Sequence, residues 1–163
     1  MRTLNQTRLH ELFDYRDGQL VRRINAGNQL AGAIAGSVNA KGHVNVCVDG
    51  SMWAAHQVVF VWHHGWLPIE IDHENRVKTD NRIENLRPAT STQNKGNIGL
   101  LRSNQSGFRG VSLNRRSMKW HAQIKVMGKQ TYLGRFDTPE EAAATYNHAA
   151  RLYFGEFAHL NDV

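Results

Sequence analysis

A long, well-capped helix near the C-terminus is the segment whose structure this sequence specifies most tightly. Thr138 can accept hydrogen bonds from the free backbone amides of the first turn, Pro139 is tolerated there, and Glu141 completes a capping box. Residues 142–154 are rich in alanine and aromatic side chains, and Gly155 ends the helix. Such a helix has an apolar face that must pack against a second apolar surface.

Three strand-like runs precede this helix and supply that surface. In the middle run apolar and polar residues alternate, which places them on opposite faces of a strand. The apolar face carries Trp120, Ala122, Ile124 and Val126, with Leu133 from the third run; the polar face carries His121, Gln123 and Lys125, with Gln130 and Tyr132. The pattern predicts a small three-stranded antiparallel sheet packed on one helix.

Composition divides the whole chain into three regions and a linker. They are an N-terminal β-rich region, 1–51; a central region, 52–98; the linker, 99–105; and the sheet-and-helix module, 106–163. In the first two regions we expect these elements: a helical turn at 9–13, a hairpin turn at Asp17-Gly18, a strand within 42–50, a helix over 54–66, a strand at 69–73, a polar loop at 74–85 and a short helix at 91–95. The sequence therefore predicts an α+β fold.

The charge balance favours a polyanionic partner. Lys plus Arg total 20 against 14 acidic residues, which gives a formal net charge of +6, and basic proteins attract polyanions. No stretch approaches the roughly 20 apolar residues of a membrane-spanning helix, and the N-terminus lacks the apolar core of a signal peptide. We therefore expect a cytoplasmic protein without a membrane partner. Cys47 is the single cysteine, which excludes an internal disulfide.

The residues with the strongest chemical signature lie between positions 72 and 94. Asp72-His73 is followed by Asn85 twelve positions after the histidine, and by Asn94 nine positions later. Cleavage of a phosphodiester needs a base that takes a proton from water and a cation that stabilises the phosphorane. A neutral histidine suits the first task near pH 7, and carboxylate and amide oxygens suit a hard cation. By contrast, His63 and His64 point apart on a helix, so we expect no zinc site there.

This pattern resembles the HNH nuclease motif, in the branch of phage homing endonucleases where asparagine replaces the last histidine. The resemblance implies a ββα-metal (His-Me finger) unit around one divalent ion, Mg²⁺ or another such as Mn²⁺. It implies that His73 is the general base and that Asp72 and Asn94 are metal ligands. Asn85 would tie the loop to the strand and so orient His73 for catalysis. His56 matches a histidine that begins the family's longer pattern.

The C-terminal module resembles the APETALA-two type domain of plant ethylene-response factors, through residues 106–161. In that family the sheet enters the DNA major groove. The matching contact positions are Arg109, Ser112, Gln123, Lys125, Gln130 and Tyr132, with Arg115 or Arg116 in the first hairpin. Ser112 and Gln130 stand where the plant proteins place arginine, and Gln123 where they place glutamate, so the plant target sequence does not carry over. Arg82 and Arg87 in the central region are further expected phosphate contacts; the alternative is that each is only solvated.

Together these features predict a metal-dependent DNA endonuclease of the homing type, acting on double-stranded DNA in a bacterial or phage-infected cell. We expect a monomer on DNA, with a dimer as the alternative, and either one strand or both could be cut. Two other functions stay open at this point. One is a catalytically inactive, sequence-specific DNA-binding regulator that keeps the nuclease scaffold, and the other is an enzyme that acts on RNA.

Overall fold

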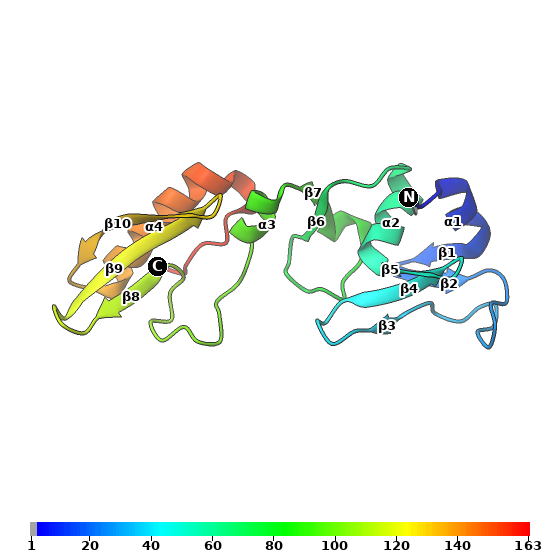
Figure 1. Ribbon diagram of the computed structural model, residues 1–163, viewed down its shortest axis with the longest axis horizontal. Helices are drawn as coiled ribbons and strands as arrows, with labels where there is room; N and C mark the ends of the chain where they lie inside the picture. Colours follow the sequence, from blue (N-terminus) through cyan, green and yellow to red (C-terminus); the bar gives the residue numbers. More distant parts are fainter. Residues whose placement is uncertain (1–2) are drawn as a thin grey trace. The chain divides into compact units, whose positions relative to one another are not determined.

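The computed structural model describes residues 3–163, which divide into two compact units on either side of the Ala89–Thr90 bond (Figure 1). Met1 and Arg2, on which the expectation of no signal peptide partly depends, lie outside the described residues. Within residues 3–163 no helix combines the length and the apolar character needed to cross a membrane. Both units combine small antiparallel β-structure with helices, so the protein is a mixed α and β structure.

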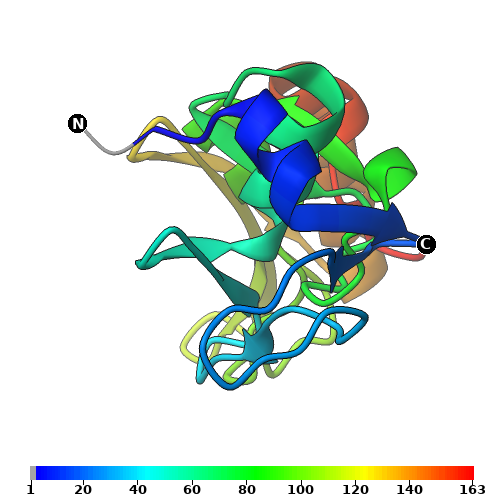
Figure 2. The ribbon, with the colours of Figure 1, turned by 90° about the vertical axis from the view of Figure 1, so that its right-hand side faces the viewer.

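The first unit is built from hairpins arranged around one central helix. Its elements in chain order are α1 (Gln6–Leu12), β1 (Phe13–Arg16), β2 (Gln19–Arg22), β3 (Ser37–Val38), β4 (Val44–Val48), β5 (Ser51–Ala54), α2 (Ala55–His64), β6 (Glu70–His73), the 3-10 helix η1 (Ile83–Asn85) and β7 (Leu86–Ala89). Strands β1 and β2 form one antiparallel pair, β3-β4-β5 form a three-stranded sheet, and β6 and β7 form a second pair. Figure 2 shows α1 lying beside α2 in this unit.

The core of the first unit forms around α2 because this helix buries most of its apolar side chains. Val58, Val59 and Val61 are almost fully buried, and they pack with Phe13 and Val46 from the strands. The helix ends at His64, and Gly65 follows it in the left-handed conformation. The predicted helix is thus confirmed: it begins at Ala55, one residue later than expected, and it ends at His64-Gly65, where the sequence indicated its C-terminal end.

Two local features of this unit differ from the sequence pattern. The one or two helical turns expected at 9–13 are present as α1, but the helix starts earlier, at Gln6, and Phe13 is already the first residue of β1. The residue pattern alone did not indicate a strand at 86–89, where Pro88 argues against one. The strand forms because β7 is an edge strand, paired with β6 in a sheet of two strands, and proline is tolerated in an edge strand.

The second unit contains the predicted sheet and its covering helix. Its elements are α3 (Ser91–Gly96), β8 (Val111–Asn114), β9 (Lys119–Val126), β10 (Lys129–Phe136), α4 (Pro139–Phe154) and the 3-10 helix η2 (Gly155–Phe157). The sheet is antiparallel with order β10-β9-β8, and α4 covers one face of it (Figure 1). Thr138 accepts a hydrogen bond from the Glu141 amide at 3.3 Å, as the capping box predicted.

Helix α3 belongs to the second unit. The backbone amide of His159 donates to the Gly96 carbonyl oxygen at 3.1 Å, and Gly96 packs closely against the Phe154 side chain. The residues that follow, 97–110, form an irregular loop before β8.

Candidate active site

Asp72 and His73 are the last two residues of β6, and both side chains are buried, with exposed fractions of 4% and 7%. Pairing with β7 fixes this end of the strand, because Asp72 lies opposite Arg87 and His73 lies opposite Leu86. An ionisable pair this deeply buried needs polar partners within the unit.

His73 is held by Asn81, a residue that sequence reasoning did not single out. The His73 Nε2 atom lies 3.2 Å from the Asn81 Oδ1 atom. The Asn81 Nδ2 group donates to the Thr79 carbonyl at 3.3 Å, which turns the amide oxygen toward the imidazole. With the oxygen as acceptor, Nε2 carries the ring proton and Nδ1 carries the lone pair. Asn81 stands eight residues after His73 in the polar loop, and only its burial, at 3% exposed, distinguishes it there.

The surroundings of His73 favour its neutral form. Burial lowers the pKa of His73 below its usual value of 6.5, although the hydrogen bond to Asn81 and the charge of Asp72 oppose the shift. A histidine in this state is neutral at pH 7 and has one lone pair available, which is what a general base requires.

Asn85 joins the two ends of the loop that follows His73. Its Oδ1 atom accepts from the Asn75 amide at 2.9 Å, and its Nδ2 group donates to the Asp80 carbonyl at 2.8 Å. Its own carbonyl accepts from the Glu74 amide at 3.0 Å. These bonds fix the backbone directly after His73; that they orient the imidazole for catalysis stays a prediction.

The Asp72 carboxylate is bound by Arg87. Both Nε and Nη2 of Arg87 lie 2.9 Å from Asp72 Oδ2, and the two side chains are 17% and 5% exposed. The Arg87 guanidinium holds the carboxylate expected to bind metal, and its expected contact with DNA phosphate stays a prediction. Arg82, the other expected phosphate contact in this region, forms a two-point pair with Asp80 at 2.9 and 2.8 Å. That pair lowers the pKa of the Asp80 carboxyl, and half of the Arg82 side chain remains exposed.

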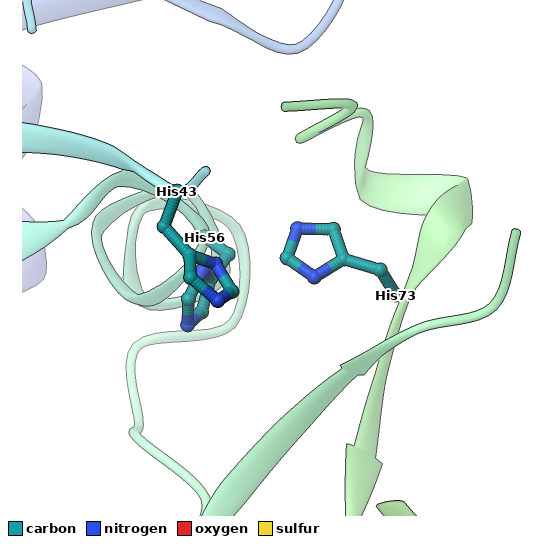
Figure 3. A group of neighbouring side chains, drawn as sticks. All are labelled: His43, His56 and His73. Carbon is teal, nitrogen blue, oxygen red and sulfur yellow. The ribbon is translucent and has the colours of Figure 1, made fainter. Parts of the chain in front are cut away.

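Two more histidines lie next to His73 (Figure 3). The ring centroid of His56, in the first turn of α2, lies 5.0 Å from that of His73, and the centroid of His43, just before β4, lies 5.9 Å away. Burial is the main cause that lowers the pKa of His56 to about 3 and lowers the pKa of His43. His43 could not have been found from sequence spacing, because it precedes His73 by thirty residues in another strand region.

Asn94 lies in the second unit, on α3. Its backbone amide donates to the Thr90 carbonyl at 3.0 Å, and its side chain is half-buried. Since Asp72 belongs to the first unit, the joint role of these two residues as metal ligands stays a prediction.

In the second unit, one face of the sheet gathers four of the expected DNA contacts. Lys125 pairs with Gln130 across β9 and β10, and Gln123 pairs with Tyr132. The Gln130 amide donates to the Gln123 side-chain oxygen, and the Tyr132 ring contacts His121 at 5.4 Å between centroids. These side chains alternate with the apolar residues that pack under α4, so they lie on the polar face of the sheet.

The arginines of this unit lie in two different environments. The Arg109 guanidinium donates to the carbonyl oxygens of Lys95 and Gly96, at the end of α3, and lies over the Tyr146 ring. Arg115 and Arg116 are exposed in the turn between β8 and β9. A hollow of about 910 Å³ within this unit is lined by Arg109, Arg115, Gln123, Lys125 and Gln130 among others.

Comparison with known proteins relates the chain to two different groups. A family model described as HNH endonuclease matches residues 54–95. An uncharacterised HNH endonuclease of Acanthamoeba polyphaga mimivirus is 36% identical over 95 residues, which are 58% of this chain and 48% of that protein. Protein 3.8 of Escherichia phage T7 is 31% identical over 88 residues, 54% of this chain and 72% of that protein.

The other group consists of plant transcription factors. An AP2-like ethylene-responsive transcription factor of Arabidopsis thaliana is 45% identical over 78 residues, which are 48% of this chain. The chain spans only 16% of the length of that plant protein, so the similarity concerns one module of it.

Proposed function

This chain belongs to the HNH endonuclease family and joins an HNH segment to an AP2-like DNA-binding segment, and we propose that it hydrolyses phosphodiester bonds of double-stranded DNA with His73 as the general base. One observation carries the proposal. A neutral, buried imidazole is hydrogen-bonded to Asn81 directly beside the Asp72 carboxylate. The reaction would take place in a bacterial or phage-infected cell, at preferred sites in the manner of a homing enzyme.

The chain's own residues divide the chemical work as follows. The Nδ1 lone pair of His73 takes a proton from the attacking water, while the Nε2 proton stays on its bond to Asn81. Asn85 keeps the backbone after His73 in place through its bonds to both ends of the loop. Arg87 holds the Asp72 carboxylate in one orientation at the end of β6.

Asp72 and Asn94 would hold a divalent cation, Mg²⁺ or Mn²⁺. The donor set fits, because it consists of a carboxylate and an amide oxygen, which hard cations prefer over nitrogen. When bound, the cation supplies stabilisation of the negative charge on the phosphorane and on the leaving 3′ oxygen. As part of the same proposal, β6, β7 and α3 correspond to the two strands and the helix of the ββα-metal unit.

The polar face of the β8–β10 sheet is proposed to select the DNA site. Lys125 and the amides of Gln123 and Gln130 can donate to base edges and phosphates, and a sheet of this width fits the B-form major groove. The A-form major groove of RNA is too deep and narrow for it, which argues against RNA as the substrate. With one active site in each chain, a monomer would nick one strand.

Removal of divalent metal should abolish cleavage. We expect supercoiled plasmid to be nicked or linearised with Mg²⁺ or Mn²⁺, and to stay supercoiled when EDTA is in excess, because the phosphorane charge is then unstabilised. Gel electrophoresis of the plasmid measures this. Binding to DNA without cleavage under every metal condition would instead support the inactive-regulator alternative, and cleavage in excess EDTA would contradict the metal site.

The pH profile of cleavage should show an acid limb below pH 6.5. Only neutral His73 has a lone pair for the water proton, so activity is lost as pH falls through its pKa, which burial places below 6.5. The logarithm of the single-turnover rate plotted against pH measures this limb.

The variant Asn81→Leu tests the positioning role of Asn81 in the same assay. Leucine keeps the site dry but accepts no hydrogen bond, and the bond from Asn81 raises the pKa of His73. We therefore expect the acid limb to move to lower pH and the plateau rate to fall about 10–100-fold. An unchanged profile would show that Asn81 does not position the base.

A further inference from the structure

We propose that His43, His56 and His73 form a binding site for a borderline transition-metal cation such as Zn²⁺, and that a cation bound there inhibits the nuclease by occupying His73. The binding part stands on the structure of the first unit alone. The inhibitory part rests on the proposed function of His73 as general base.

The geometry of the three side chains supports a shared ligand. His43 comes from the loop before β4, His56 from α2 and His73 from β6, and one ring nitrogen from each lies within 4.8 Å of the other two. Figure 3 shows His43 and His56 together on one side and His73 opposite them. Tetrahedral zinc with Zn–N bonds of about 2.0–2.1 Å places its nitrogen ligands about 3.3 Å apart. Small rotations about the side-chain bonds would close the remaining gap.

Two nitrogens of this cluster have no hydrogen-bond partner among residues 3–163. They are the buried Nδ1 atoms of His43 and His56. Buried polar atoms are nearly always paired, so two exceptions side by side call for an explanation. A cation bound at the cluster would give these imidazoles the partner that the protein does not.

The charge state of the cluster also fits a metal site. Histidine binds metal only as neutral imidazole, and burial keeps His43 and His56 neutral by lowering the pKa of each. Lys41 and Lys78 add positive charge near His43, and the Lys78 ammonium donates to the Lys41 carbonyl. This charge weakens cation binding, so we expect zinc to bind reversibly rather than as a permanent structural ion.

The donor set distinguishes this site from the proposed catalytic one. Three imidazoles suit Zn²⁺, Ni²⁺ or Cu²⁺, whereas Mg²⁺ requires oxygen ligands. Asp72 and Asn94 offer oxygen, so the two cations would use different side chains. The two sites are linked through His73, because the nitrogen that would bind zinc is the one that would act as the base. A lone pair bound to zinc cannot accept a proton from water. Zinc would therefore counteract the magnesium-supported reaction.

Titration of the full chain with Zn²⁺ tests the site without any measurement of activity. Calorimetry is carried out on four chelator-treated proteins: wild type, His43→Asn, His56→Asn and the control His64→Gln. Wild type and the control should each bind one zinc per chain. His64 lies exposed on the same helix as His56 but outside the cluster. Each cluster variant should bind at least about tenfold more weakly. Circular dichroism verifies folding, and His43→Asn, in a loop, remains informative if His56→Asn disturbs α2. Equal zinc affinity in all four proteins would overturn the site.

Zinc addition to the magnesium-supported cleavage reaction tests inhibition. The zinc concentration that halves the rate should rise at least about tenfold in His43→Asn relative to wild type, each compared with its own zinc-free rate. Equal sensitivity of the two proteins, or cleavage supported by zinc alone, would overturn the inhibitory role. If the wild type does not cleave DNA with Mg²⁺ or Mn²⁺, the proposed function fails, and the zinc titration still decides whether the site exists.

Discussion

Replacement of His73 by alanine should slow DNA cleavage by about 10²–10⁴-fold, the range that a general base contributes. The affinity for DNA should change little, because the polar sheet face proposed to read DNA lies in the second unit. Single-turnover cleavage of a plasmid measures the first effect, and fluorescence anisotropy with labelled duplex measures the second. The reason for the large loss is that His73 is neutral, buried and held at Nε2 by Asn81, which leaves Nδ1 as the base.

A matched control and a second variant make this result interpretable. His64→Ala removes an exposed histidine of α2 outside the active site and should cleave at the wild-type rate. Since His73 is buried, alanine leaves a cavity, and His73→Gln keeps most of the volume while losing the basic nitrogen. If both His73 variants cleave as fast as wild type while folded, the assignment of the general base is wrong.

The substitution Gly110→Ala should destabilise the second unit by about 2–5 kcal/mol. Gly110 has φ +72°, a conformation that costs a residue with a Cβ atom about 1–2 kcal/mol. The added Cβ would also overlap the Tyr146 ring and lie 2.6 Å from the Gln123 carbonyl oxygen, and overpacking of this kind adds about 1–3 kcal/mol. Hydrogen exchange of the β9 amides in the full chain measures the loss for this unit separately from the first.

Gly128→Ala is the control for backbone strain alone. Gly128 has φ +81°, but apart from its two chain neighbours no residue of 3–163 places an atom within 4 Å of an added Cβ, so the cost should stay at about 1–2 kcal/mol, the strain of the backbone alone. Under conditions where Gly110→Ala unfolds the second unit, site preference in DNA binding should be lost, whereas Gly128→Ala should keep it. Equal destabilisation by the two substitutions would contradict the packing of Tyr146 against Gly110.

Much of the fold could be predicted because its signals are local. The Thr138 capping box, the Asp17-Gly18 turn and the alternation within β9 each depend on residues a few positions apart. Such signals act through backbone hydrogen bonds and side-chain periodicity, which neighbours in the chain determine by themselves. Strand β7 was missed because proline opposes a strand locally, and only its place at the edge of a pair permits one.

In the candidate site, too, some features follow from residues close in the chain and others depend on the tertiary fold. The nuclease spacing of Asp72, His73, Asn85 and Asn94 could be recognised from the residues alone, as could the basic, sheet-forming module after them. The fold of the first unit was needed to reveal that Asn81 holds the His73 imidazole, that Arg87 is bound to Asp72, and that His43 and His56 lie beside His73. These contacts join residues from separate strands, loops and helices. Their formation depends on strand pairing and burial in the first unit, which no spacing along the chain expresses.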